Sequence, residues 1–219
     1  MNLPTVKLYG VDFDKISFHH IKERIETEMK GEKDLAVQIT PSEADNVHML
    51  YEMAFHKFLN EHPDKVAEKM ASNIREFKEL SDLEGQDYAR EKFELEAFDS
   101  YIDDLTAKEN GSNRMRLLMG MLHLAVKHDR RLLALEPETK GLPGSFLLTK
   151  EGKVCGMSLE EGAYGKNVLE LRKNHIMGKL HNISADPLTK NRLAVLLDHK
   201  VAVEIAEELK QLGWFSIED

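Results

Sequence analysis

Three side chains that can ligate a metal ion recur at intervals of four residues in the first quarter of the chain. His48, Glu52 and His56 form one stripe of a helix predicted between Pro41 and His62, because residues four apart are neighbours on a helix surface. Imidazole and carboxylate suit zinc or another first-row metal. A straight helix cannot surround an ion, so a metal-assisted enzyme would need ligands from another element. The alternative is a solvated polar face.

No other residue set completes a catalytic signature. His123 interrupts an apolar run, which is typical of a core histidine with a hydrogen-bond partner. The single cysteine, Cys155, falls in a predicted strand, and we expect a buried, inert thiol. A phosphate-binding glycine loop and a serine nucleophile elbow are both missing from the sequence. The sequence therefore predicts no cofactor.

The acidic residues between Glu76 and Asp104 give the clearest functional signal. Eleven acids stand in this segment against three basic residues. The segment is helical by pattern, and a negative helical surface attracts basic partners. We expect six acids to bind the partner: Glu84, Asp87, Glu91, Glu94, Glu96 and Asp99. The alternative is a solvated face that only keeps the protein in solution.

The sign of the charge reverses after residue 111. Residues 1–111 hold 14 Lys/Arg and 25 Asp/Glu, whereas residues 112–200 hold 15 and 9. Clustered basic residues can contact nucleic-acid phosphates. A nucleic-acid-binding function would use the basic region 114–192, and the candidate contacts are arginines at the two ends of the next predicted helix: Arg114, Arg116, Arg130 and Arg131. Alternatively, the acidic and basic parts attract one another.

The first forty residues predict a strand, a helix and a second strand. Residues 5–9 and 35–40 alternate between apolar and polar types, and apolar residues between Phe18 and Met29 recur every three or four positions. Thr40 and Glu43 then predict a capping box at the start of the next helix.

Helices dominate the middle of the chain. A helix beginning at Pro63 is followed by a second capping-box pattern at residues 81–84 and a helix over 87–108. Asn110-Gly111-Ser112 is a turn signal and the best candidate boundary. The helix expected over 114–135 is apolar on nearly all sides, so we expect it to be central.

The C-terminal part predicts a β-hairpin and terminal helices. Strands over 145–149 and 153–157 flank a turn at Gly152. Asp186-Pro187 opens a helix to about His199, and a last helix runs to Gln211.

Together these patterns predict an α+β protein that is mainly helical. An acidic region, 1–111, precedes a region with the central apolar helix, hairpin and terminal helices, 112–219, and we expect the two to pack as one unit. With no secretory signal or apolar segment of membrane length, the expected location is cytoplasmic without membrane contact.

The leading functional hypothesis is a non-catalytic adaptor, inhibitor or assembly component that binds a basic protein. Accessory proteins of bacteria, phages and mobile elements have this profile. A metal-assisted enzyme, nucleic-acid binding and a homo-oligomer stay open as alternatives.

Overall fold

The chain folds into two compact units whose segments alternate along the sequence. Unit 1 comprises Met1–Asp12, Gly31–Asp45 and Arg131–Asp219, and unit 2 comprises Phe13–Lys30 and Asn46–Arg130. The computed structural model describes residues 5–13, 15–31, 33–107, 113–136, 153–154, 157–158, 163–185, 192–211 and 215–216. The boundary predicted at residues 110–112 lies outside them, and the division into acidic and basic regions stays a prediction.

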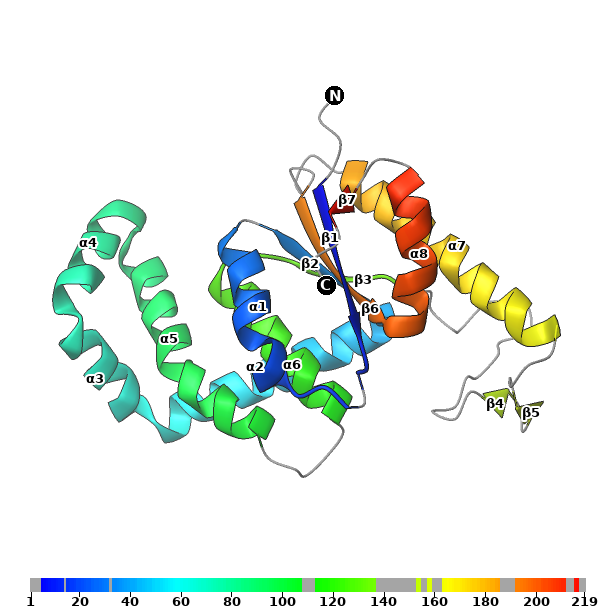
Figure 1. The fold of residues 1–219 in the computed structure, drawn as a ribbon. Helices are drawn as coiled ribbons and strands as arrows, with labels where there is room; N and C mark the ends of the chain where they lie inside the picture. Colours follow the sequence, from blue (N-terminus) through cyan, green and yellow to red (C-terminus); the bar gives the residue numbers. More distant parts are fainter. Residues whose placement is uncertain are drawn as a thin grey trace. The chain divides into compact units, whose positions relative to one another are not determined.

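Unit 1 is built on a parallel five-stranded sheet (Figure 1). Its strand order is β3-β2-β6-β1-β7, and every neighbouring pair is parallel. The strands are β1 (Thr5–Val11), β2 (Asp34–Val37), β3 (Leu132–Ala134), β6 (Arg192–Asp198) and β7 (Phe215–Ser216). The predicted first and second strands are therefore confirmed, although β6 lies between them.

The centre of the sheet corrects the prediction of a helix over 187–199. Residues 192–198 form strand β6, which pairs with β1 on one side and β2 on the other. Leu193 to Leu197 are all buried. A parallel strand covered on both faces reads as a continuous apolar run, and periodicity alone does not separate such a run from a short buried helix.

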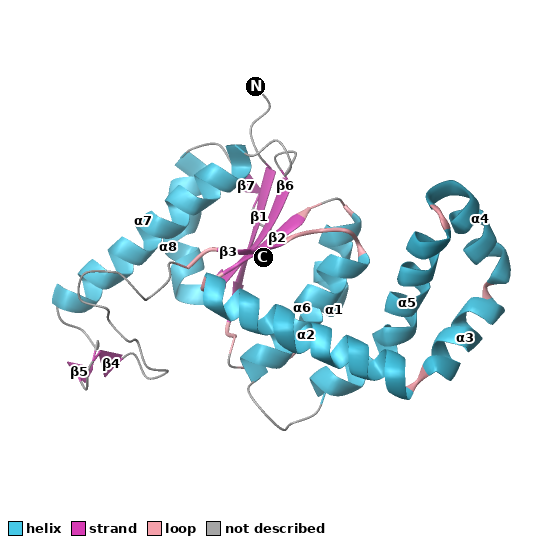
Figure 2. Cartoon of the chain, turned by 180° about the vertical axis from the view of Figure 1, so that it is seen from behind, coloured by secondary structure: helices cyan, strands magenta, loops and turns pink. Residues whose placement is uncertain are grey.

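Two helices lie on the same side of this sheet. Helix α7 (Ala163–Ala185) contributes Ile176 and Leu180 to the apolar core of unit 1, and helix α8 (His199–Gln211) contributes Val201 and Ile205. Figures 1 and 2 show both helices beside β1 and β6. The last predicted helix is thus confirmed.

The predicted hairpin is changed in its pairing. Strand β4 (Lys153–Val154) pairs antiparallel with β5 (Met157–Ser158), so the strand expected over 153–157 is split in two. The partner strand predicted over 145–149, Gly152 and Cys155 lie outside the described residues.

Unit 2 is helical (Figure 2). Its elements are α1 (Phe18–Lys30), most of α2 (Pro41–Glu61), α3 (Pro63–Ser72), α4 (Ile74–Glu84), α5 (Gln86–Ala107) and α6 (Asn113–Lys127). Residues Leu117 to Ala125 of α6 are buried on every side, which confirms the expected central helix. The predicted end at residue 135 is wrong, because α6 ends at Lys127 and residues 132–134 form strand β3.

The two predicted capping boxes have opposite outcomes. At the start of α2 the Thr40 N–H donates to Glu43 Oε2 at 3.0 Å, and the Glu43 N–H donates to Thr40 Oγ1 at 3.1 Å. This reciprocal pair confirms the first box. The second prediction is wrong, because residues 81–84 are the last turn of α4 and Gly85 ends that helix with its N–H bonded to the Ser81 carbonyl.

The fold class expected from the sequence, a mainly helical α+β protein, is confirmed. Within the described part of the chain, no helix combines the length and apolar character that crossing a bilayer requires.

Candidate functional site

The connection between α4 and α5 carries exposed carboxylates beside an exposed leucine. Glu84 ends α4, and Asp87 and Glu91 lie on the first turns of α5, all three exposed. Among the described residues none of these three carboxylates forms an ion pair. Leu83, which directly precedes Glu84, is 80% exposed. We call Asp82, Leu83, Glu84, Asp87 and Glu91 the acidic tip.

The acidic tip is held by a turn that only glycine adopts easily and by one aromatic contact. Gly85 has φ 99° and ψ 156°, a region that costs other residues conformational energy. Phe77 of α4 packs edge-on against the buried ring of Phe93 of α5, with 5.4 Å between the ring centroids. Helix α4 has no buried residue of its own. Two of its apolar side chains, Ile74 and Leu83, are exposed and therefore available to a partner.

Lys92 of α5 is engaged with the end of α6 and does not pair with the acidic tip. Lys92 Nζ donates to Asp129 Oδ2 at 2.6 Å and to the Lys127 carbonyl at 2.9 Å. Asp129 follows the end of α6 with φ 53°, and its carboxylate also accepts from the Tyr88 hydroxyl at 3.1 Å. Lys92 thus provides a hydrogen-bond donor to a carbonyl at the end of α6. It does not offset the negative charge of the acidic tip.

The other three acids predicted to bind a partner are engaged within unit 2. Glu94 accepts from Arg90 Nε at 2.9 Å, and Glu96 pairs with Lys69 at 2.9 Å. Asp99 accepts from Lys127 Nζ at 2.5 Å and pairs with His123 Nε2 at 2.7 Å. Half of the predicted set therefore stabilises the helices, and Glu84, Asp87 and Glu91 remain on the surface.

Asp99 belongs to a polar network in the core of unit 2. His123 is buried, its Nε2 faces Asp99, and its Nδ1 lies 3.0 Å from the Tyr51 hydroxyl. Burial, reinforced by the Asp99 charge, raises the pKa of the Tyr51 hydroxyl, so it stays protonated. The expectation of a core histidine with a hydrogen-bond partner is confirmed. The network therefore joins α2, α5 and α6 through one buried imidazole.

The predicted metal ligands lie on the outer face of α2. His48, Glu52 and His56 are all exposed. In the parts of the chain that the structure describes, no group of three or more His, Cys, Asp or Glu side chains is placed to hold a metal ion. The metal site stays a prediction without a second element to complete it.

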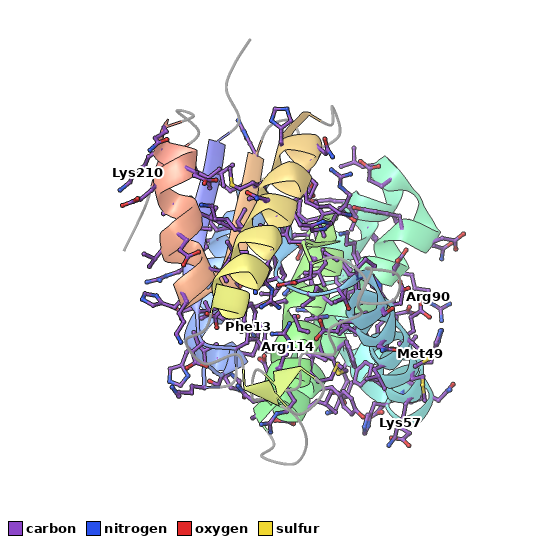
Figure 3. All side chains as sticks on the ribbon, turned by 90° about the vertical axis from the view of Figure 1, so that its right-hand side faces the viewer. Phe13, Met49, Lys57, Arg90, Arg114 and Lys210 are labelled. Carbon is purple, nitrogen blue, oxygen red and sulfur yellow. The ribbon has the colours of Figure 1, made fainter. Side chains whose placement is uncertain are left out.

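The four predicted nucleic-acid-binding arginines have separate environments. The Arg114 guanidinium lies 4.8 Å from the centroid of the Phe13 ring (Figure 3). Arg131, in unit 1, donates to Asp34 from its backbone N–H and its guanidinium, at 2.7 to 3.0 Å. Arg116 lies in the first turns of α6, and Arg130 lies beyond its last residue, Lys127. Each keeps a buried Nε without a hydrogen-bond partner.

Sequence reasoning missed a group of residues at the carboxyl end of the parallel sheet. The β1–β6 register pairs Val11 with Asp198, so Asp12 and Asp198 follow or end adjacent strands. The Asp198 N–H donates to Gln38 Oε1 at 2.7 Å, and Asp198 Oδ1 accepts from the Lys200 N–H at 3.0 Å. The signal was the continuous apolar run over residues 193–197, which is typical of a buried parallel strand.

The strand order makes this edge of the sheet a topological switch point. The chain leaves β1 toward β2 and leaves β6 toward β7, so the connections of these adjacent strands run in opposite directions. In open α/β sheets, ligands bind outside the carboxyl ends of the strands at such a switch point. Gly10 belongs to this edge, because a Cβ there would lie 2.9 Å from His199 Nδ1.

Comparisons with known proteins add no relationship: no family model, curated protein or solved structure matches the chain.

Proposed function

We propose that this chain is a protein-interaction protein that captures a basic, amphipathic segment of a partner at the acidic tip. The observation that carries the proposal is the exposure of Leu83 next to Glu84 and four residues before Asp87, carboxylates that form no ion pair within the described residues. An adaptor, an inhibitor and an assembly component would all use such a surface.

The two kinds of side chain at the acidic tip have different roles. Covering a leucine side chain contributes about 2 kcal/mol of binding free energy. Each exposed ion pair contributes only about 0.2–1 kcal/mol, and salt screens it. Leu83 therefore supplies affinity, and Glu84, Asp87 and Glu91 select a positively charged partner and accelerate its approach.

A defined peptide tests this proposal. The probe is an amphipathic helical peptide with lysines on one face and leucines on the other, and its binding is followed by fluorescence anisotropy at low and high salt. We expect the combined variant Glu84→Gln, Asp87→Asn and Glu91→Gln to weaken binding roughly tenfold at low salt. Leu83→Ser should weaken binding at both salt concentrations.

A matched control separates this surface from the total charge of the protein. Glu204 and Glu207 are exposed acids on α8 of unit 1. Replacing both by glutamine should leave peptide binding within about twofold of the original, because neither residue belongs to the proposed binding surface. Equal losses in the tip variant and in this control would show that the peptide responds only to net charge, which contradicts the proposal.

A second candidate function is favoured by the switch point of the unit 1 sheet. Asp12 follows β1 and Asp198 ends the adjacent strand β6, at the edge where α/β sheets commonly bind ligands. Carboxylates suit Mg²⁺, which commonly bridges to substrate phosphates. An NMR titration with Mg²⁺ and then with Mg²⁺–ATP should shift the amides of Gly10, Asp12 and Asp198 first, and shifts elsewhere alone would remove this candidate.

A further inference from the structure

Helix α2 carries a second apolar stripe in addition to the one that faces the core. Val47, Tyr51 and Phe58 are buried on one side of the helix. On the opposite side Met49 is 53% exposed and Met53 is 62% exposed. Methionine is soft and adaptable, and exposed methionines recur at binding surfaces. The outer side of α2 therefore has the composition of a contact surface.

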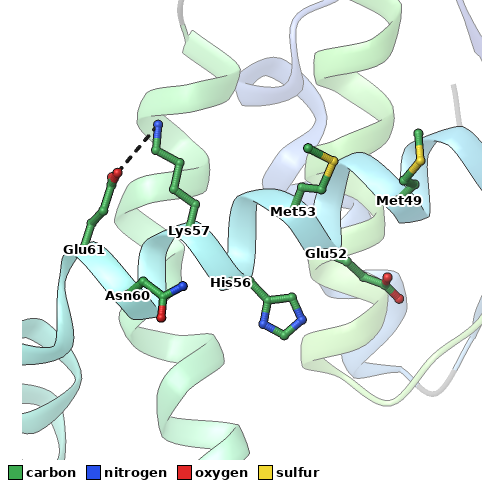
Figure 4. A pocket seen from close by; sticks show the side chains of 7 residues that line it. All are labelled: Met49, Glu52, Met53, His56, Lys57, Asn60 and Glu61. Carbon is green, nitrogen blue, oxygen red and sulfur yellow. Dashed lines mark ion pairs between the residues drawn. The ribbon is translucent and has the colours of Figure 1, made fainter.

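The exposed stripe has the spacing of a coiled-coil seam. Met49, Met53, His56 and Asn60 follow one another at intervals of four, three and four residues and line one shallow hollow on α2. These are the intervals between successive core positions of a heptad repeat. Figure 4 shows them in two rows along the helix, with Met49 and Met53 in one row and His56 and Asn60 in the other.

Opposite charges flank this seam on its two sides. Glu52 precedes Met53 and takes the g position of the heptad, and Lys57 follows His56 and takes the e position. Lys57 also contacts Glu61 at 3.9 Å, a long pair between two exposed side chains. Residues g and e five positions apart are the pair that meets across a parallel two-stranded coiled coil.

We propose that the outer stripe of α2 binds α2 of a second copy of this chain, with the two helices parallel. The two-fold axis then brings Glu52 of each copy to Lys57 of the other, which makes two equivalent ion pairs around a centre of Met49 and Met53. An antiparallel pair would place Glu52 against Glu52 and Lys57 against Lys57, since equal heptad positions face each other in that arrangement. The charge pattern therefore selects a parallel homodimer.

Sedimentation equilibrium of the full chain over about 5–500 µM tests the pairing. We expect a reversible monomer–dimer equilibrium, which Met53→Asp weakens by roughly tenfold or more because it places a charge in the seam. Val203 on α8 is 57% exposed, so Val203→Asp is a control of matched exposure and chemistry. This control should leave the equilibrium unchanged, and circular dichroism verifies that both variants are folded.

Charge exchange tests the orientation and does not depend on the folding of Met53→Asp. Glu52→Lys and Lys57→Glu should each weaken the dimer roughly tenfold, because two ion pairs become two repulsions. The double exchange should restore it to within about threefold. A monomer at all concentrations, or a double variant as weak as the single ones, would overturn the proposal.

Discussion

His123 Nε2 lies 2.7 Å from Asp99 Oδ1, and the two residues join the central helix α6 to the long helix α5. Tyr51 of α2 extends the pair, since its hydroxyl lies 3.0 Å from His123 Nδ1. Both ring nitrogens of a buried imidazole are therefore partnered. Unpartnered buried polar atoms are costly, so this network fixes how three helices of unit 2 pack.

Removing the Tyr51 hydroxyl should destabilise the protein without creating a large cavity. Tyr51→Phe keeps the ring that packs edge-on against Phe98 and leaves His123 Nδ1 unpartnered. We expect the free energy of unfolding to fall by about 1–3 kcal/mol, measured by urea denaturation. Tyr88→Phe is the control, because its hydroxyl bonds at the surface. Equal losses in both variants would contradict the structural role of the network.

Asp99 should make the stability of the protein depend on pH in the acid range. Burial alone would raise the pKa of Asp99, but hydrogen bonds from His123 and Lys127 and their charges hold this pKa below its usual value. A lowered pKa in the folded state contributes stability above the unfolded value of about 3.9, and this stability is lost as pH falls toward the folded pKa.

The comparison of wild type with Asp99→Asn measures this contribution. Between about pH 5 and pH 3 the wild-type unfolding free energy should fall more steeply than that of the variant, which lacks the titrating group. At pH 7 the variant should be less stable by about 1–2 kcal/mol, because it keeps one acceptor and loses the charge. Parallel pH profiles would show that Asp99 does not carry the acid dependence.

Gly85 should be essential to the geometry of the acidic tip. Its φ of 99° and ψ of 156° disfavour any side chain, although no atom would obstruct a Cβ. Gly85→Ala should therefore cost about 1–3 kcal/mol and weaken peptide capture at Leu83 and Asp87. Gly178 in helix α7 also has open space around a Cβ. Gly178→Ala should stabilise the protein by about 0.5–1 kcal/mol, and a loss there of similar size would remove the backbone explanation.

Gly120 should be required for a different reason, the close approach of α1 to α6. A Cβ at this position would lie 2.5 Å from the buried ring of Phe18. Gly120→Ala should destabilise the protein by about 1–3 kcal/mol through overpacking. Combining it with Phe18→Leu should cost less than the sum of the two single changes, because the smaller side chain makes room. Strict additivity in thermal and urea unfolding would contradict the contact.

Local patterns predicted the elements that local interactions determine. The Thr40–Glu43 capping box and the apolar face of α1 depend on residues within a few positions of each other, so the sequence contains them directly. Strand β6 was mistaken for a helix because its burial between β1 and β2 depends on strands more than 150 residues away. The same limit applies to Asp99, whose partners His123 and Lys127 are 24 and 28 residues distant.

The sequence predicted that the candidate site is acidic, but it did not predict which acidic residues are exposed. An acidic helical surface was expected, but sequence could not tell which carboxylates point to solvent, because exposure depends on how α3, α5 and α6 pack. Glu96 and Asp99 meet Lys69 and Lys127 on other helices. The exposure of Leu83 could not be predicted for a further reason. An apolar residue in a helix is expected to face the core, but α4 has no buried residue.

The footprint of the basic peptide on the protein tests the central claim most directly. Hydrogen–deuterium exchange of the full chain, with and without the lysine–leucine peptide, measures which backbone amides exchange more slowly when the peptide binds. The proposed function predicts slower exchange across residues 82–91 on peptide addition, and roughly tenfold more peptide should be needed for the same slowing in the Glu84→Gln, Asp87→Asn, Glu91→Gln variant at low salt. Slowing confined to other segments, for example α8, or the same dependence on peptide concentration in this variant, would contradict it.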